Sequence, residues 1–152
     1  MTAPTRLAQG YYWQELKVGD EFETFARTIT ESDLVQFINC TGMLEAIFIE
    51  EGYSGGAMQG RPVPGALTYT FIEGFILQSM IQGTGLAMLE LQQKILAPVV
   101  VGDTIRARIV VNEVKPTSKS GRAVVTSTVH VLNQHGTEVM TYVTKRLLAG
   151  KP

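Results

Sequence analysis

The junction between a loop rich in proline and glycine and a long apolar run is the part of this sequence best suited to chemistry. The loop is Gly60-Arg61-Pro62-Val63-Pro64-Gly65, whose two prolines and two glycines exclude both helix and central strand. The run that follows, residues 66–81, is apolar on nearly every side, which predicts a buried helix. Because the first N–H groups of a helix have no partner within it, the helix start beside Gly65 can bind an anion or polarise a carbonyl group.

Glu73 places a carboxylate inside this apolar run, eight residues after Gly65 and about 12 Å further along a helix. A carboxylate in such surroundings needs a partner or a function, because a charge loses its hydration when it is buried. Two alternatives remain open for Glu73. It forms an ion pair with Arg106 or Arg108 on a later strand, or it takes part in catalysis.

A shorter helix is predicted between Thr30 and Gly42. Thr30 and Asp33 have the spacing of a capping box, and the apolar residues that follow recur at helical spacing. Gly42 supplies a typical C-terminal cap. We therefore interpret Asp33 as a helix cap rather than as an acid catalyst. Cys40 falls on the same helix and is expected to be a buried, unreactive thiol.

Strand patterns dominate the rest of the chain, because apolar and polar residues alternate there. The predicted strands are residues 21–28, 86–96, 105–111, 124–131 and 139–144. Short turns join the last four, so they form an antiparallel sheet. The predicted fold class is α+β, with an antiparallel sheet wrapped around one long central helix and residues 1–152 as a single domain. Its edge strands are not blocked by proline, which predicts a dimer with one continuous sheet.

Composition excludes several other classes of protein. The 13 basic residues are scattered and the net charge is −1, which argues against nucleic acid as a partner. A single cysteine and two histidines, His130 and His135, exclude an internal disulfide and a three-histidine zinc site, so we expect no metal and no cofactor. The run 66–81 is too short and too polar to span a membrane. Residues 1–9 lack the apolar core of a signal peptide, so we expect a cytoplasmic protein.

From about Val18 to Lys145 the sequence resembles the MaoC-like hydratase/dehydratase family, which includes the (R)-specific enoyl-CoA hydratases and has the hotdog fold. The resemblance is carried by the order of its short motifs rather than by any single one. They are Val18-Gly19-Asp20, Thr30-x-x-Asp33, Thr41-Gly42, Gly60-Arg61-x-x-x-Gly65-x-Leu67, Ala97-Pro98-Val99-x-Val101-Gly102-Asp103-Thr104, Ser120-Gly121-Arg122 and Asn133-Gln134-x-Gly136-x-x-Val139.

This resemblance implies an activity, a binding site and an assembly. Family members hydrate trans-2-enoyl-CoA to (R)-3-hydroxyacyl-CoA, or catalyse the reverse dehydration, as dimers and without a metal. The thioester of coenzyme A or of an acyl carrier binds at the start of the central helix. By resemblance, the substrate-binding residues of this chain are Arg61, Pro64, Gly65 and Thr70. Thr70 retains the hydroxyl group that family members have on the first turns of the central helix.

The family's catalytic Asp and His, five residues apart, hold the water that adds across the double bond. Here the two positions are Met43 and Phe48, neither of which can move a proton. The resemblance therefore leaves three alternatives. Glu45, the one ionisable residue of this segment, is a replacement base whose pKa is raised by apolar neighbours. The chain is a non-catalytic acyl-binding or partner subunit of a heteromer. Or the chain is a thioesterase that uses Glu73, as some hotdog thioesterases use a carboxylate within the central helix.

Overall fold

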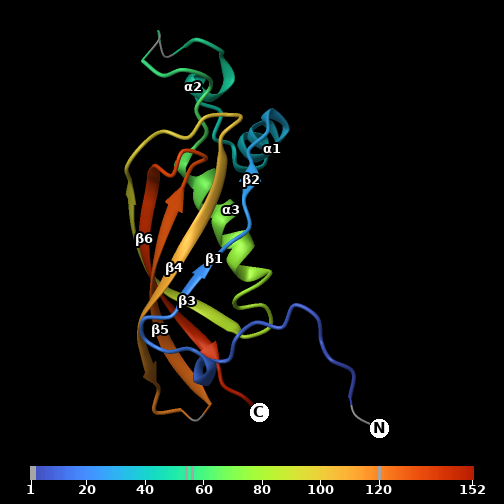
Figure 1. Ribbon diagram of the computed structural model, residues 1–152. Helices are drawn as coiled ribbons and strands as arrows, with labels where there is room; N and C mark the ends of the chain where they lie inside the picture. Colours follow the sequence, from blue (N-terminus) through green and yellow to red (C-terminus); the bar gives the residue numbers. More distant parts are fainter. Residues whose placement is uncertain (1–2, 54, 56, 120) are drawn as a thin grey trace.

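An antiparallel sheet curves around one helix, α3, in the computed structural model of this protein (Figure 1). The model describes residues 3–53, 55, 57–119 and 121–152. Within these residues the strand order is β1-β4-β5-β6-β3, and β2 pairs with β4. The strands are β1 (Glu21–Glu23), β2 (Arg27–Thr28), β3 (Gly85–Ile95), β4 (Thr104–Pro116), β5 (Arg122–Leu132) and β6 (Glu138–Ala149). The helices are the 3₁₀ turn η1 (Trp13–Glu15), α1 (Glu31–Thr41), α2 (Ala46–Ile49) and α3 (Gly65–Leu77).

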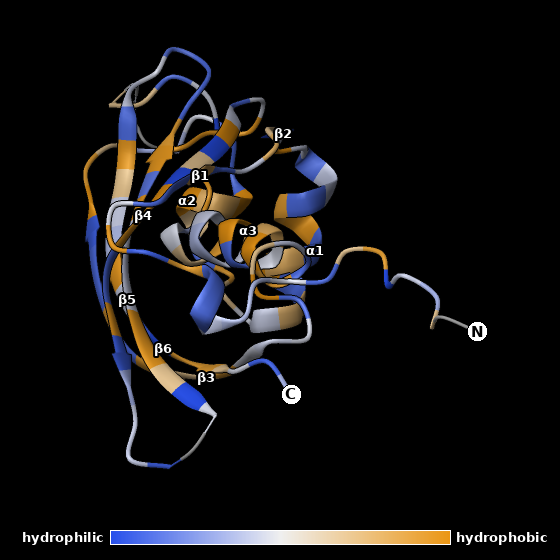
Figure 2. Ribbon diagram, turned by 60° about the horizontal axis from the view of Figure 1, so that its bottom comes forward, coloured by the Kyte–Doolittle hydropathy of each residue, from blue (hydrophilic) through white to orange (hydrophobic). Residues whose placement is uncertain are grey.

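Buried and more exposed residues alternate along the strands, and the buried face of the sheet packs against α3. In β5 the buried residues run from Ala123 to Val131 in steps of two, and their neighbours are half-exposed. Figure 2 shows hydrophobic residues concentrated on α3 and on the strands that curve around it. All strand pairs are antiparallel. The predicted α+β architecture, an antiparallel sheet around one central helix, is thus confirmed.

Helix α3 is shorter than predicted. It begins at Gly65 as expected but ends at Leu77, and turns occupy residues 78–84 instead of the helix that was predicted to run to residue 81. At the helix end the Ser79 hydroxyl donates to the Phe75 carbonyl, and the Ile81 N–H donates to the Ile76 carbonyl, a longer step than that of an α-helix. These bonds satisfy the last carbonyls of α3 while they turn the chain toward β3.

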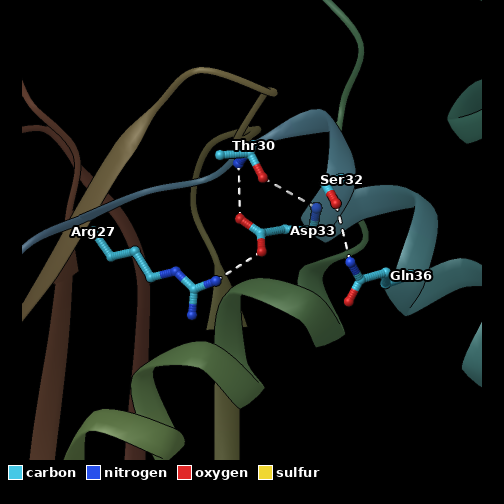
Figure 3. A network of polar contacts seen from close by, with 5 residues as sticks. All are labelled: Arg27, Thr30, Ser32, Asp33 and Gln36. Carbon is cyan, nitrogen blue, oxygen red and sulfur yellow. Dashed lines mark hydrogen bonds and ion pairs between the residues drawn. The ribbon is translucent and has the colours of Figure 1, made fainter.

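The capping box of α1 is present as predicted (Figure 3). The Thr30 hydroxyl accepts from the Asp33 N–H at 3.1 Å, and the Asp33 carboxylate accepts from the Thr30 N–H at 2.8 Å. Arg27 also donates to Asp33, at 2.7 Å. Partial burial acts to raise the pKa of Asp33, but the bonds from Thr30 and the charge of Arg27 outweigh it and hold that pKa below its ordinary value. At the other end Gly42 has the left-handed φ of 76° that a C-cap glycine favours.

Two local predictions were wrong, and one short helix was missed. The strand expected over residues 21–28 splits into β1 and β2, because the Thr24 hydroxyl takes the place of a backbone carbonyl and accepts from the Ala107 N–H. Helix α2, a single turn, was not predicted. Cys40 is exposed rather than buried, since it lies on the outer side of α1. Ser54, Gly56 and the Ser120 of the Ser120-Gly121-Arg122 motif lie outside the described residues.

Strand β3 is an uncovered edge of the sheet. Every one of its residues is exposed, including Leu86, Leu89, Leu91 and Ile95. The chain exposes 8798 Å², about 1,200 Å² more than the roughly 7,600 Å² expected for a compact monomer of 16.6 kDa. Part of this excess belongs to the N-terminal segment, which extends away from the sheet (Figure 1). Among the described residues, no helix combines the length and apolar character that crossing a membrane requires.

Candidate functional site

The start of α3 is an uncapped helix N-terminus. Its N-cap residue is Pro64, which has no N–H of its own, and no side chain in the described part of the chain caps this end. The Pro64 carbonyl accepts from the Leu67 N–H at 2.9 Å, which begins the helical bonding. The N–H groups of Gly65 and Ala66 therefore remain available, and the helix dipole gives this end a partial positive charge. It can stabilise a carbonyl oxygen or an anion.

A small pocket of about 40 Å³ adjoins this helix start. Gly65 and Thr68 of α3 line it together with Ile95 of β3 and Met140 of β6. A Cβ atom on Gly65 would lie 2.4 Å from the Ile95 Cδ1 atom, so only glycine allows the present approach. The Ile95 side chain is 62% exposed and can rotate away. The side chain that comes nearest to Gly65 is thus one that can move.

Two other residues predicted to bind substrate form contacts of their own. The Thr70 hydroxyl donates to the carbonyls of Ala66 and Leu67, at 2.8 and 3.1 Å, on the exposed side of α3. Arg61 forms an ion pair with Glu31 and lines a separate surface pocket of about 210 Å³. The structure therefore brings Pro64 and Gly65 to the helix start, places Thr70 on the next turn, and directs Arg61 toward α1.

The segment that holds Met43, Glu45 and Phe48 contains no buried acid or base. Met43 is 40% exposed, and Phe48 of α2 packs partly against the core. Glu45 is exposed and caps α2, accepting from the Ala46 N–H at 3.1 Å. The apolar surroundings expected for Glu45 are therefore not present in the single chain. Figure 1 shows this segment beyond the end of the sheet at which α3 begins.

Glu73 forms a buried ion pair, but with a different arginine from the two that were predicted. Its Oε1 atom accepts from Arg146 at 2.5 Å and from the Tyr142 hydroxyl at 2.8 Å. Arg106 and Arg108 alternate with the buried residues of β4, so they point away from α3 and pair with acidic residues of β1 instead. Burial, together with the negative charge of Glu73, raises the pKa of Tyr142 far above its ordinary value.

A larger pocket of about 350 Å³ opens beside this pair, between α3 and β3. Tyr69, Glu73 and Arg146 supply its polar groups, and Leu77 and Met88 contribute to its apolar wall. Burial and then the charge of Glu73 raise the pKa of Tyr69, so this phenol stays protonated. The pocket and the helix start lie toward opposite ends of the same α3–β3 face.

Sequence reasoning missed three residues of this face: Thr68, Tyr142 and Arg146. In β6 the alternation alone did not show which side faces the core, whereas the structure places Tyr142 and Arg146 on the buried side, in contact with Glu73 of α3. The sequence did contain one signal for this face: the apolar residue Leu148 is an even number of residues from Tyr142 and Arg146, so all three lie on the same side of the strand. Nothing in the sequence distinguishes Thr68 from any other threonine on a helix, so its role could not be predicted.

Comparisons with known proteins identify the family. A model of the FAS1-like dehydratase domain region matches residues 17–142. An (R)-specific enoyl-CoA hydratase of Rhodospirillum rubrum is 28% identical over 110 residues, which is 72% of this chain and 75% of that protein. The crystal structure of a MaoC-like dehydratase from Rhodospirillum rubrum has a TM-score of 0.80 at 20% identity, covering 94% of this chain and 99% of that one.

A second solved structure establishes the name of the fold. It is a conserved hypothetical protein of Mycobacterium tuberculosis with a double hotdog fold, and it matches 97% of this chain with a TM-score of 0.86 at 16% identity. This chain covers 46% of that protein, about half of it. The chain therefore belongs to the family of FAS1-like dehydratase domain regions and is a hotdog protein of the MaoC-like hydratase group.

Proposed function

We propose that this protein binds an acyl thioester, of coenzyme A or of an acyl carrier protein, at the N-terminus of α3. The observation that carries this proposal is the uncapped helix start at Gly65, which lines a pocket and where a Cβ atom would collide with the Ile95 side chain. A thioester oxygen that gains negative charge is stabilised by positioned N–H groups in a site shielded from water. The 28% identical relative is named as an enoyl-CoA hydratase, which supports the same class of ligand.

The reaction class that we propose is hydration of a 2-enoyl thioester to the (R)-3-hydroxyacyl thioester, or the reverse. In hydration, water adds its OH to C3, while C2 receives a proton and the thioester oxygen carries the enolate charge in between. Removal of the water proton and delivery of the C2 proton both need a positioned acid/base group. Met43 and Phe48 supply none, so the chain holds the binding half of such a site.

We propose that another hotdog unit completes the assembly through the β3 edge, as a second copy or as a related chain that retains the Asp and His. An exposed strand of this length presents unpaired N–H and C=O groups that a second strand can satisfy. The Mycobacterium tuberculosis protein, whose single chain contains a double hotdog, supports pairing of two such units.

The test is a comparison of binding and hydration of crotonyl-CoA by the purified chain. We expect calorimetry to detect binding, and the loss of enoyl absorbance to show slow hydration. The variant Met43→Asp/Phe48→His should hydrate faster, because positioned acid/base groups contribute about 10²–10⁴-fold each, although the absence of evolved supporting contacts reduces the gain. Met43→Asn/Phe48→Gln is the matched control, polar but without a titrating pair.

Two outcomes would contradict the proposal. Absence of crotonyl-CoA binding would reject the thioester site. Fast hydration by the unmodified chain that is lost in Glu45→Gln would instead make Glu45 the base, in an assembly that buries it.

Thioester hydrolysis by Glu73 is the second candidate function. It is favoured by one observation, the 350 Å³ pocket that this buried carboxylate borders. Against it, Oε1 of Glu73 is already held by Arg146 and Tyr142, which lowers its reactivity as a nucleophile or base. Release of free coenzyme A thiol by the purified chain, abolished in Glu73→Gln, would establish hydrolysis.

A further inference from the structure

The hydroxyl of Thr68 is buried and has no partner among the described protein atoms. Thr68 lies one turn into α3 and is 1% exposed, and its Oγ1 atom makes no hydrogen bond. A threonine in a helix commonly donates to a carbonyl three or four residues earlier. Thr70 does so in this same helix, but Thr68 does not.

Thr68 lies at the pocket beside the helix start. Thr68 and Gly65 both line that pocket, whose remaining walls include the apolar side chains of Val63, Ile95 and Met140. A buried hydroxyl without a partner destabilises a protein, and valine would fill the same space without that cost. The pocket, of about 40 Å³, is large enough for a single oxygen atom or a water molecule, but not for an acyl chain.

We infer that Thr68 is a second hydrogen-bond donor to the thioester carbonyl oxygen. This inference rests on the proposed function. A carbonyl oxygen has two lone pairs, and the helix start provides N–H donors for one of them. The Thr68 hydroxyl donates to the other from the side of the pocket, while the acyl chain and the carrier remain outside it. Both donors strengthen their bonds as the oxygen becomes enolate-like, which is the charge that develops during hydration or dehydration.

The test compares a ligand that contains the carbonyl with one that lacks it. In Thr68→Val we expect crotonyl-CoA to bind about tenfold more weakly, the effect of losing one good hydrogen bond. Binding of S-butyl-CoA, a thioether without the carbonyl, should not change. Thr68→Ser restores the hydroxyl and should recover crotonyl-CoA binding. Because the orphan hydroxyl is removed, the melting temperature of Thr68→Val should stay the same or rise.

Thr84→Val is the matched control. Thr84 is also fully buried with an unpartnered hydroxyl, but it lies beyond the other end of α3 and does not line the pocket. We expect it to leave the binding of both ligands unchanged.

Two results would overturn the inference about Thr68. One is unchanged crotonyl-CoA binding by Thr68→Val while the unmodified chain binds normally, which leaves the proposed function intact. The other is an equal loss of both ligands with a lowered melting temperature, which would make the role structural. If the unmodified chain binds neither ligand, the proposed function fails, and this inference with it.

Discussion

Removing Arg146 should show whether Glu73 is a structural charge or one that is free for chemistry. Both side chains of the pair are 10% exposed, so water from the adjoining pocket replaces the guanidinium only in part in Arg146→Met. Breaking one side of a buried ion pair costs about 3–5 kcal/mol, because it leaves an uncompensated charge. The Tyr142 hydroxyl still donates to Glu73 and offsets part of this loss, so we expect a value of about 3 kcal/mol, the lower end of that range.

The double variant Glu73→Leu/Arg146→Met should recover most of this stability. Replacing both charges by apolar side chains of similar volume removes the desolvation cost together with the attraction. The assay is urea unfolding of the unmodified chain, both single variants and the double variant, at one protein concentration, since the stability of an oligomer depends on concentration. A loss below about 1 kcal/mol for Arg146→Met, or simple additivity of the two single variants, would refute the ion pair and favour Glu73 as a reactive carboxylate.

Three further predictions concern the binding site, the assembly and the acid stability. Gly65→Val should abolish crotonyl-CoA binding with little loss of fold, because the exposed Ile95 side chain can move aside, whereas Gly74→Ala, with open space around it, should bind normally. Light scattering at micromolar concentration should give a mass of at least twice 16.6 kDa, and a mass near 16.6 kDa would refute pairing of β3. Because the pKa of Asp33 is lowered in the folded chain, its ionised carboxylate stabilises the fold at pH values above the unfolded pKa of about 4. This contribution disappears as the pH falls through the lower pKa of the folded chain. Asp33→Asn should therefore flatten the acid limb of a plot of unfolding free energy against pH.

The sequence by itself determined the elements whose signals are local. Thr30, Asp33 and Gly42 define α1 because a capping box and a C-cap glycine act within a few residues of the chain. Strand alternation and short turns likewise predicted the antiparallel sheet. The ordered motifs predicted the family, whereas the assignment of Met43 and Phe48 to the positions of its acid/base pair stays a prediction.

Only the tertiary structure decided which residues meet across the sheet. Glu73 required a partner, but the choice of Arg146 over Arg106 and Arg108 depends on which face of each strand points toward α3. The end of α3 depends on the bonds that Ser79 and Ile81, beyond the helix, donate to carbonyls of its last turn as the chain turns toward β3. The isolation of the Thr68 hydroxyl depends on apolar neighbours from distant strands. A sequence pattern specifies the periodicity of each element, whereas the register between elements follows from packing the whole core at once.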